Sequence, residues 1–375
     1  MRSKQTFSLI VLVCLALGLR AQVVKMEKAY DQSFAYQEGD KVLIENKYGE
    51  VIVNSWYKDS VRVKVQLEAS GKNQDAVNKV MRRIDIDLRK IGERITAETQ
   101  VEVRGGGVLG EIARDVGNYS KSLFSSNNKF TANYEVWLPT DAEISIENRY
   151  GDIYLSTLEG EVSIDLAHGD LRADRIEQTI DLDHSFGKAS FDFVKVGTLN
   201  LRGVELSIEE ATTLQFESSS SEIELETCED IQFNSRNDNF DIRKAQNVMG
   251  KGSFTDITVG ELKDRGRLDF RYGDVLLNYV NKEFKELTVN GKSTDISVVL
   301  DQASYLKTRV TGKEEGLLVP NSMLTLNREV LENDMVQLEG MVGNTNEVVS
   351  ELTIIADGGE LIVAIQDTPI FTSKD

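Results

Sequence analysis

The sequence predicts an all-β protein, a right-handed parallel β-solenoid of about nine units, each roughly 17–18 residues long, with strand-rich caps at both ends and one short helix. Three observations predict it. An internal repeat runs through residues 141–300, apolar and polar residues alternate within each unit, and an aromatic residue followed by glycine returns at the same place in several units. Repeats of this length are typical of solenoids, whose units stack on one another.

Residues 1–21 are predicted to be a secretory signal peptide. Arg2 and Lys4 precede an apolar run that is too short to span a bilayer, and Ala21 offers a cleavage point. We therefore expect a protein of the periplasm, the outer cell surface or the extracellular space. No later segment resembles a membrane span, so we expect no integral membrane segment.

Residues 22–140 are predicted to form a strand-rich N-terminal cap. Apolar residues alternate in residues 51–53 and 61–65, and residues 73–83 carry apolar residues at helical spacing. A cap of this kind covers the exposed edge of a terminal solenoid unit.

A flexible insertion is expected at residues 104–130. Residues 105–110 match the dinucleotide-binding pattern GxGxxG, but the chain shows no alternation of strands and helices around it, and an exported protein meets no dinucleotide pool. We therefore reject a nucleotide site here.

The repeat of residues 141–300 becomes visible when the units are aligned on the residue after the corner glycine. These anchors follow one another at a nearly constant spacing, with one longer interval at the end, and the first and third positions after each anchor are apolar in every unit. The anchors are Asp152, Asp170, Lys188, Glu205, Glu222, Asn239, Asp256, Asp274 and Asp295.

Two architectures can use such alternation, a parallel coil or an antiparallel meander. Equivalence of position in every unit favours the coil, because the apolar pair of one unit must lie on the pair of the next. The shorter units of the repeat break the strict hexapeptide rhythm of a left-handed solenoid, so we predict a right-handed one.

The repeated phrase IENRYGDI at residues 146–153 is interpreted as a corner of the solenoid. Its glycine is expected to supply the positive φ that such corners often need. A second copy, IENKYGEV at residues 44–51, lies outside the unbroken repeat and predicts an N-terminal strand pair with the same corner.

Residues 301–375 are predicted to form a strand-rich C-terminal cap. The rhythm of the repeat lapses there, but β-rich runs return, and Asp357-Gly358-Gly359 is interpreted as a hairpin turn between two of them.

The formal net charge is −19. An excess of this sign repels phosphate backbones and anionic head groups, so nucleic acid is not an expected partner. Cys228 is the only cysteine after the signal peptide, which excludes an internal disulfide in the exported chain; we expect it to be a small core residue.

One candidate binding site is an aromatic column formed by Tyr150, His168 and Phe186 at consecutive corners, with Phe254 and Tyr272 further along. Aromatic faces can stack on sugar rings, but aromatic ladders also stabilise solenoids by packing on one another. Both interpretations stay open on the sequence alone.

A second candidate is an acidic column that contains Asp152, Asp170, Asp256 and Asp274. Oxygen ligands suit calcium, although the glycine-rich nonapeptide loops that bind calcium in other solenoids are missing. The alternative is a wetted corner at which water and salt screen the charges. We expect no other cofactor.

For catalysis, His168 and His184 are the only histidines, and neither accompanies a nucleophile motif. Asp181 and Asp183 share one face of a strand, as do the paired carboxylates of polysaccharide-cleaving enzymes. The chain contains 62 acidic residues, so some pair will always be close, and we expect no catalytic residues.

The signal peptide, the early phrase ENKYGEVIVNSW and repeats of the type IENRYGDIYLSTLEGEVSIDLAHGDL together resemble the putative adhesin domain family of exported bacterial proteins. The resemblance covers about residues 36–300. It implies a right-handed β-solenoid-like domain at the cell surface or in the periplasm, and it brings no catalytic residues.

We therefore expect an exported, non-enzymatic adhesin or surface scaffold that binds carbohydrate or a cell-surface protein. The alternatives are a polysaccharide lyase or glycosidase on the same scaffold, and a purely structural periplasmic protein.

Overall fold

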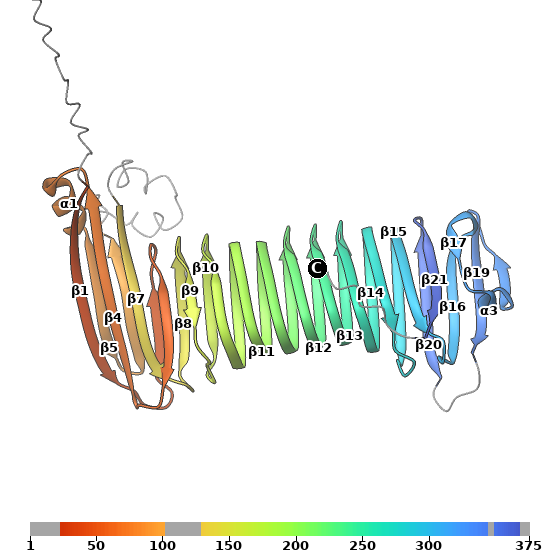
Figure 1. Cartoon of the computed structure of the whole chain (residues 1–375), viewed down its shortest axis with the longest axis horizontal. Helices are drawn as coiled ribbons and strands as arrows, with labels where there is room; N and C mark the ends of the chain where they lie inside the picture. Colours follow the sequence, from red (N-terminus) through yellow and green to blue (C-terminus); the bar gives the residue numbers. More distant parts are fainter. Residues whose placement is uncertain (1–22, 102–128, 344–348, 368–375) are drawn as a thin grey trace, which may run out of the picture.

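The structure, a computed structural model, describes residues 23–101, 129–343 and 349–367. Most of these residues lie in strands that follow one another along the long axis of an elongated molecule (Figure 1). The prediction of an all-β protein is confirmed. The predicted signal peptide at 1–21 and residues 104–128 of the predicted insertion lie outside the described residues.

The N-terminal end contains two antiparallel groups of strands. β1 (Val24–Ala35) pairs with β4 (Ser60–Gly71), and β4 pairs with β7 (Lys129–Pro139). β5 (Ile84–Ile91) and β6 (Arg94–Val101) form a hairpin. Residues 129 and 130, which we assigned to the insertion, thus begin a strand.

Helix α1 (Gln74–Met81) lies where the sequence predicted a helix. The side chain of Asn73 accepts a hydrogen bond from the backbone N–H of Ala76 at 2.9 Å, which satisfies a free donor of the first turn. Val77 is buried, and the helix packs on β1 and β4. Among the described residues, no helix has the length and apolar character needed to cross a bilayer.

The first copy of the repeated phrase is part of the parallel array. β2 (Lys41–Glu45) and β3 (Val51–Trp56) flank it and pair in parallel with β8 (Glu143–Arg149) and β9 (Ile153–Leu155). On their other side, β2 pairs in parallel with β6, and β3 with β7. The expectation that this copy lies outside the array is wrong, because the chain leaves the array for β4 and β5 and returns to it with β6.

The central array repeats the same pairing, and we call each pair of strands joined at a corner a level. Its strands are β10 (Val162–Ala167), β11 (Leu171–Ser219), β12 (Glu222–Arg236), β13 (Asn239–Ser253), β14 (Asp256–Val280) and β15 (Glu286–Asp301). Between these strands, residues pair in parallel with their equivalents one repeat later, as when Ile223 pairs with Phe240. The pairing therefore follows the register that the sequence repeat defines.

The interior of the array is built from the apolar positions of the repeat. All the apolar residues that define the repeat after the anchors are buried, from Ile153 and Leu155 to Ile296 and Val298. Alternation of period two places the intervening polar residues on the outer face. Burial of these columns is the main stabilising contribution that the repeat can make.

The parallel array continues beyond residue 300. β20 (Ser350–Asp357) and β21 (Leu361–Gln366) both pair in parallel with β15. Asp357-Gly358-Gly359 is therefore another corner of the array, and the predicted hairpin turn is wrong. β20 and β21 in turn pair in parallel with β16 (Leu306–Lys313) and β17 (Leu317–Leu318).

The remaining C-terminal elements cover this end of the array. β19 (Met335–Val342) pairs antiparallel with β16 and with β18 (Asn327–Val330). A 3₁₀ helix, Glu314–Gly316, and a short helix α3 (Asn321–Leu324) lie between the strands. The expectation of a single short helix is thus wrong. We did not predict α3 because its residues show no clear apolar period in the sequence.

Positive φ, which we expected of the corner glycines, occurs at Gly49 and Gly187, whose φ angles are 128° and 158°. Gly151, Gly169 and Gly273 are instead required for close approach between levels. The left-handed conformation falls on the preceding residue, as at Tyr150, whose φ is 58°. A Cβ on Gly151 would lie 2.0 Å from the carbonyl oxygen of Gly49, and a Cβ on Gly169 would lie 2.1 Å from that of Gly151. Only a residue without a side chain allows this approach.

Replacing Gly169 with Ala is expected to lower the free energy of unfolding by about 2 kcal/mol or more, because the added Cβ would overlap a backbone carbonyl of the adjoining level. Gly312→Ala is the matched control, since the nearest atom to its Cβ would be Leu361 Cδ2 at 3.4 Å. Thermal unfolding followed by circular dichroism measures both. A wild-type midpoint for Gly169→Ala would contradict the close approach.

Candidate functional site

Three residues of the predicted aromatic column, Tyr150, His168 and Phe186, stack on one another, whereas Tyr272 stacks on Phe254 in a separate pair. All of these residues adopt a strained backbone. Tyr150, His168, Phe186, Phe254 and Tyr272 all have φ between 55° and 62°. Residues with a Cβ rarely adopt this left-handed conformation, at a cost on the order of 1–3 kcal/mol each. The fixed corners of the array hold the five aromatic side chains at the surface.

One continuous stack contains four rings, those of Tyr48, Tyr150, His168 and Phe186. Tyr48 stacks on Tyr150 with ring centroids 5.4 Å apart, Tyr150 on His168 at 5.2 Å, and His168 on Phe186 at 5.1 Å. Phe130 packs edge-on against Tyr48 at one end. The ring faces of this stack cover one another, so mainly ring edges are open to a ligand.

At the other end of the stack, the outer face of the Phe186 ring is also covered. A Cβ on Gly203 would lie 3.0 Å from Phe186 Cδ1, so the backbone of Gly203 packs on this ring. The geometry matches the ladder interpretation for Tyr150, His168 and Phe186, in which aromatic residues at successive levels stabilise one another.

Phe254 and Tyr272 form a separate exposed pair. Their centroids are 4.9 Å apart, with 15° between the ring planes, and the side chains are 55% and 48% exposed. The neighbouring levels place Asn237 and Ser293 in the same left-handed corner position. The two rings are about as exposed as those of Tyr150 and Phe186, but the corner residues on either side of the pair are small and polar instead of aromatic.

The acidic column has a structural role at the corners. The backbone N–H of Asp170 donates to Oδ1 of Asp152 at 2.9 Å, which ties one level to the next. The same contact joins Lys188 to Asp170, Asp274 to Asp256 and Glu360 to Asp295, and Glu50 donates likewise to Oδ1 of Asn133. An acceptor at the anchor thus satisfies a backbone donor of the next level.

The carboxylates of this column also affect one another. Burial raises the pKa of Asp274, and the carboxylates of Asp256 and Asp295 raise it further. In the described ranges, no three His, Cys, Asp or Glu side chains come together as metal ligands. The calcium site at Asp152, Asp170, Asp256 and Asp274 therefore stays a prediction.

Inside the corners, Asn148 and His184 occupy one column, since both are in register with Leu166. The amide of Asn148 donates to the carbonyls of Gly151 and Gly49 at 2.8 and 3.1 Å. His184 is buried, and its Nε2 donates to the carbonyl of Gly169 at 2.9 Å. The Asn of the repeated phrase therefore links the corners of two adjacent levels by hydrogen bonds.

Neither histidine is placed for general base catalysis. His168 lies between two stacked rings, and His184 lies in the core, where burial lowers its pKa against the opposing effect of the Gly169 hydrogen bond. Asp181 and Asp183 are exposed on one face, as predicted. Burial also raises the pKa of the Cys228 thiol to about 12, which matches the expected core role.

The structure adds a surface that the sequence analysis did not single out. We call it the polar wall: three neighbouring rows of outward-facing residues on β12 to β15, in the middle one of which Asn234, Lys251, Asp269 and Asn290 follow one another in register. Its members are Gln232, Asn234, Arg236, Met249, Lys251, Ser253, Arg267, Asp269, Arg271, Thr288, Asn290 and Lys292.

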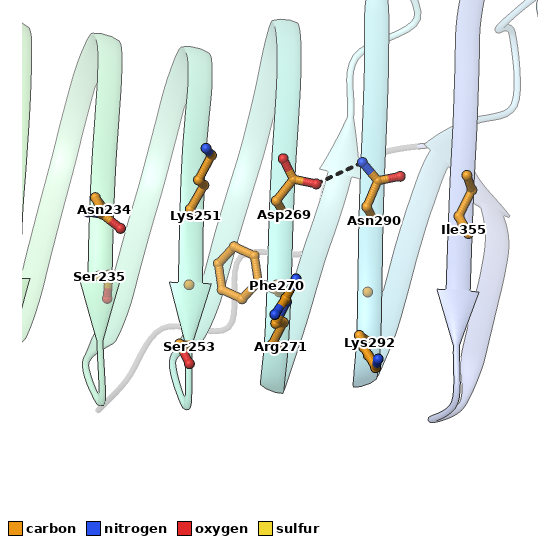
Figure 2. Close-up of a pocket in the computed structure, with 12 residues that line it drawn as sticks. Asn234, Ser235, Lys251, Ser253, Asp269, Phe270, Arg271, Asn290, Lys292 and Ile355 are labelled. Atoms are coloured by element: carbon orange, nitrogen blue, oxygen red, sulfur yellow. Dashed lines mark hydrogen bonds between the residues drawn. The ribbon is translucent and has the colours of Figure 1, made fainter.

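Two hollows open to solvent lie over this wall. Their volumes are about 610 and 800 Å³, and both are lined by Asn234, Lys251, Asp269 and Asn290. Figure 2 shows the smaller one, in which Asn290 Nδ2 donates to Asp269 Oδ1 at 2.8 Å. The hollows therefore present amide, hydroxyl and charged groups on a regular backbone.

Large rings support the backbone beneath the wall. A Cβ on Gly250 would lie 2.1 Å from Phe233 Cζ, and a Cβ on Gly252 would lie 2.5 Å from Phe270 Cε1. The two glycines thus leave interior space for Phe233 and Phe270, which pack edge to face at 6.1 Å. Because the interior beneath these strands is closely packed, the backbone that carries the outer side chains has little room to move.

The comparisons with known proteins are weak. No protein-family model matches the chain, and neither does any curated protein sequence. A solved structure of a putative cell adhesion protein from Clostridium sporogenes ATCC 15579 is similar with a TM-score of 0.16 and 11% identity, over 90% of this chain and 100% of that one. A putative adhesin from Parabacteroides distasonis ATCC 8503 is similar with a TM-score of 0.28 and 6% identity, over 73% and 93%. Both superpositions are loose, and we base no argument on them.

Replacing His184 with Asn is expected to weaken the dependence of stability on pH. The pKa of His184 is lowered from 6.5 in the folded protein, so the unfolded chain takes up the proton first and stability falls as the pH drops below about 6.5. Asn keeps an amide donor for the corner carbonyl and does not titrate. Unfolding midpoints at pH 7.5 and 5.5 measure the effect, and an equal drop in both proteins would contradict it.

Proposed function

We propose that the chain is a right-handed parallel β-solenoid, exported from the cell, that binds carbohydrate as an adhesin-like surface protein without catalytic activity. The observation that supports this best is the polar wall beside the exposed pair Phe254 and Tyr272. Arg271 and Lys292 of the wall precede Tyr272 and Ser293 of the corner column directly in the chain.

The side chains of this surface suit a sugar chain. Amides and hydroxyls such as those of Asn234, Ser253 and Asn290 exchange hydrogen bonds with sugar hydroxyls, and an exposed aromatic ring packs on the apolar face of a sugar ring. The surface continues over several levels, so it offers a row of equivalent positions to a ligand that is itself a repeat.

The absence of catalysis is part of the proposal. The wall contains a single acidic residue, Asp269, and its carboxylate is engaged with Asn290. Hydrolysis of a glycosidic bond ordinarily needs two carboxylates that flank the bond. The exposed Asp181 and Asp183 belong to an earlier level and line neither hollow.

The Tyr272→Ala variant is expected to bind glycans about tenfold more weakly than the wild type, because it removes an exposed ring beside the wall. A glycan array with and without calcium first identifies binding sugars, and calorimetry then compares the variants. Phe186→Ala is the matched control, since its ring belongs to the closed stack, and should keep wild-type affinity.

Three results would contradict the proposal. They are binding of no glycan, equal loss in both variants, and release of new chain ends from a bound glycan. The last result would instead support the polysaccharide-active enzyme.

A further inference from the structure

We propose that the polar wall recognises acidic carbohydrate, a sugar chain that carries carboxylate or sulfate groups. This inference rests on the proposed function and adds the chemical class of the ligand. It is carried by a group of cations that the protein does not neutralise itself, on a surface with two hollows and an exposed aromatic pair.

The cationic group consists of five exposed side chains: Arg236, Lys251, Arg267, Arg271 and Lys292. Among the described residues, none of them has an acidic group within 4.0 Å. Other Lys and Arg residues of the described structure also lack an ion pair, so these five are distinguished by lying together on one surface, whereas nearby Arg243 and Lys244 have acidic partners.

Register places the five cations close to one another. Arg271 and Lys292 are paired across adjacent strands, and Lys251 is paired with Asp269, which lies between Arg267 and Arg271 along its own strand. Adjacent strands are about 4.8 Å apart, so the group spans a few sugar lengths. Anionic groups on successive sugars could each meet a guanidinium or ammonium group.

The acidic residues at this surface are few and partly engaged. Asp269 accepts a hydrogen bond from Asn290, and Glu217, at the rim of the larger hollow, accepts one from Asn234 at 3.0 Å. Asp357 is in register with Lys292 on the next strand. Glu286 accepts a hydrogen bond from Thr288 of the wall at 3.5 Å. The five cations outnumber these four acidic residues, so the wall has a small local excess of positive charge.

Carbohydrate is favoured over nucleic acid as the source of the negative charge. The wall alternates its cations with amides and hydroxyls, namely Gln232, Asn234, Ser253, Thr288 and Asn290, which suit sugar hydroxyls. The net charge of −19 opposes approach of a densely charged phosphate backbone more strongly than that of a sugar acid.

The test compares oligogalacturonate, a sulfated oligosaccharide and methyl-esterified oligogalacturonate, in which the same backbone lacks its charge. Calorimetry at low salt should show binding of at least one acidic probe, and the methyl ester should bind at least about tenfold more weakly than oligogalacturonate if that probe binds. The double variant Arg271→Gln, Lys292→Gln should lose about tenfold in affinity for the acidic probe. Lys195→Gln, Lys263→Gln removes the same charge from exposed positions outside the wall and should bind as the wild type.

Other outcomes overturn the inference in distinguishable ways. Suppose that neutral glycans bind in a Tyr272-dependent manner and acidic probes bind no more tightly. That result would support the proposed function and contradict the inference that the ligand is acidic. Equally tight single-stranded DNA binding, lost in the same double variant, would replace carbohydrate with a general polyanion. Failure of every glycan probe, neutral and acidic, would sink both proposals.

Discussion

Close approach of equivalent backbone corners is the constraint on which the rest of the structure depends. A carbonyl of one level lies only about 2 Å from the place where a side chain of the next would begin, at Gly151, Gly169 and Gly273. This approach fixes the register, and the register then aligns every other column: buried aliphatics inside, clamping amides at the corners, and polar residues outside. The residue before the corner adopts a left-handed backbone both where the corner residue is glycine, as at Tyr150, and where it is not, as at Phe254.

The same register also arranges the side chains of the outer surface in regular rows. A residue type that recurs at the repeat spacing becomes a row on the surface, whatever its role. Rows of acceptors at the anchors satisfy backbone donors, rows of rings stack, and the rows at Lys251 and Arg271 leave cations exposed. What surrounds a ring therefore depends on the neighbouring level, as the contrast between Phe186 on Gly203 and Tyr272 beside Ser293 illustrates.

Much of this could be predicted from the sequence, because each column is a local pattern of period two within a unit. The buried pairs, the corners and α1 were predicted in this way. The parallel pairings of β6 and β7 with β2 and β3, and of β20 and β21 with β15, were not predicted, since these strands do not follow the repeat spacing in the sequence. The role of Gly151, Gly169 and Gly273 was misassigned because close approach between levels is invisible in one unit. The wall was missed because Asn234, Lys251, Asp269 and Asn290 lie in four different units, at outward positions where a polar residue is expected whatever its role.

Net charge illustrates the difference between composition and arrangement. A charge of −19 governs the field far from the protein, where salt screens it within about 10 Å. At contact distance, the field depends on which charges are already neutralised by neighbours. Lys188 and Arg243 are paired with Glu205 and Glu226, whereas the wall cations lack such partners in the described structure. An acidic protein can thus present a positive surface, because stacking in register, and not composition, decides which charges meet.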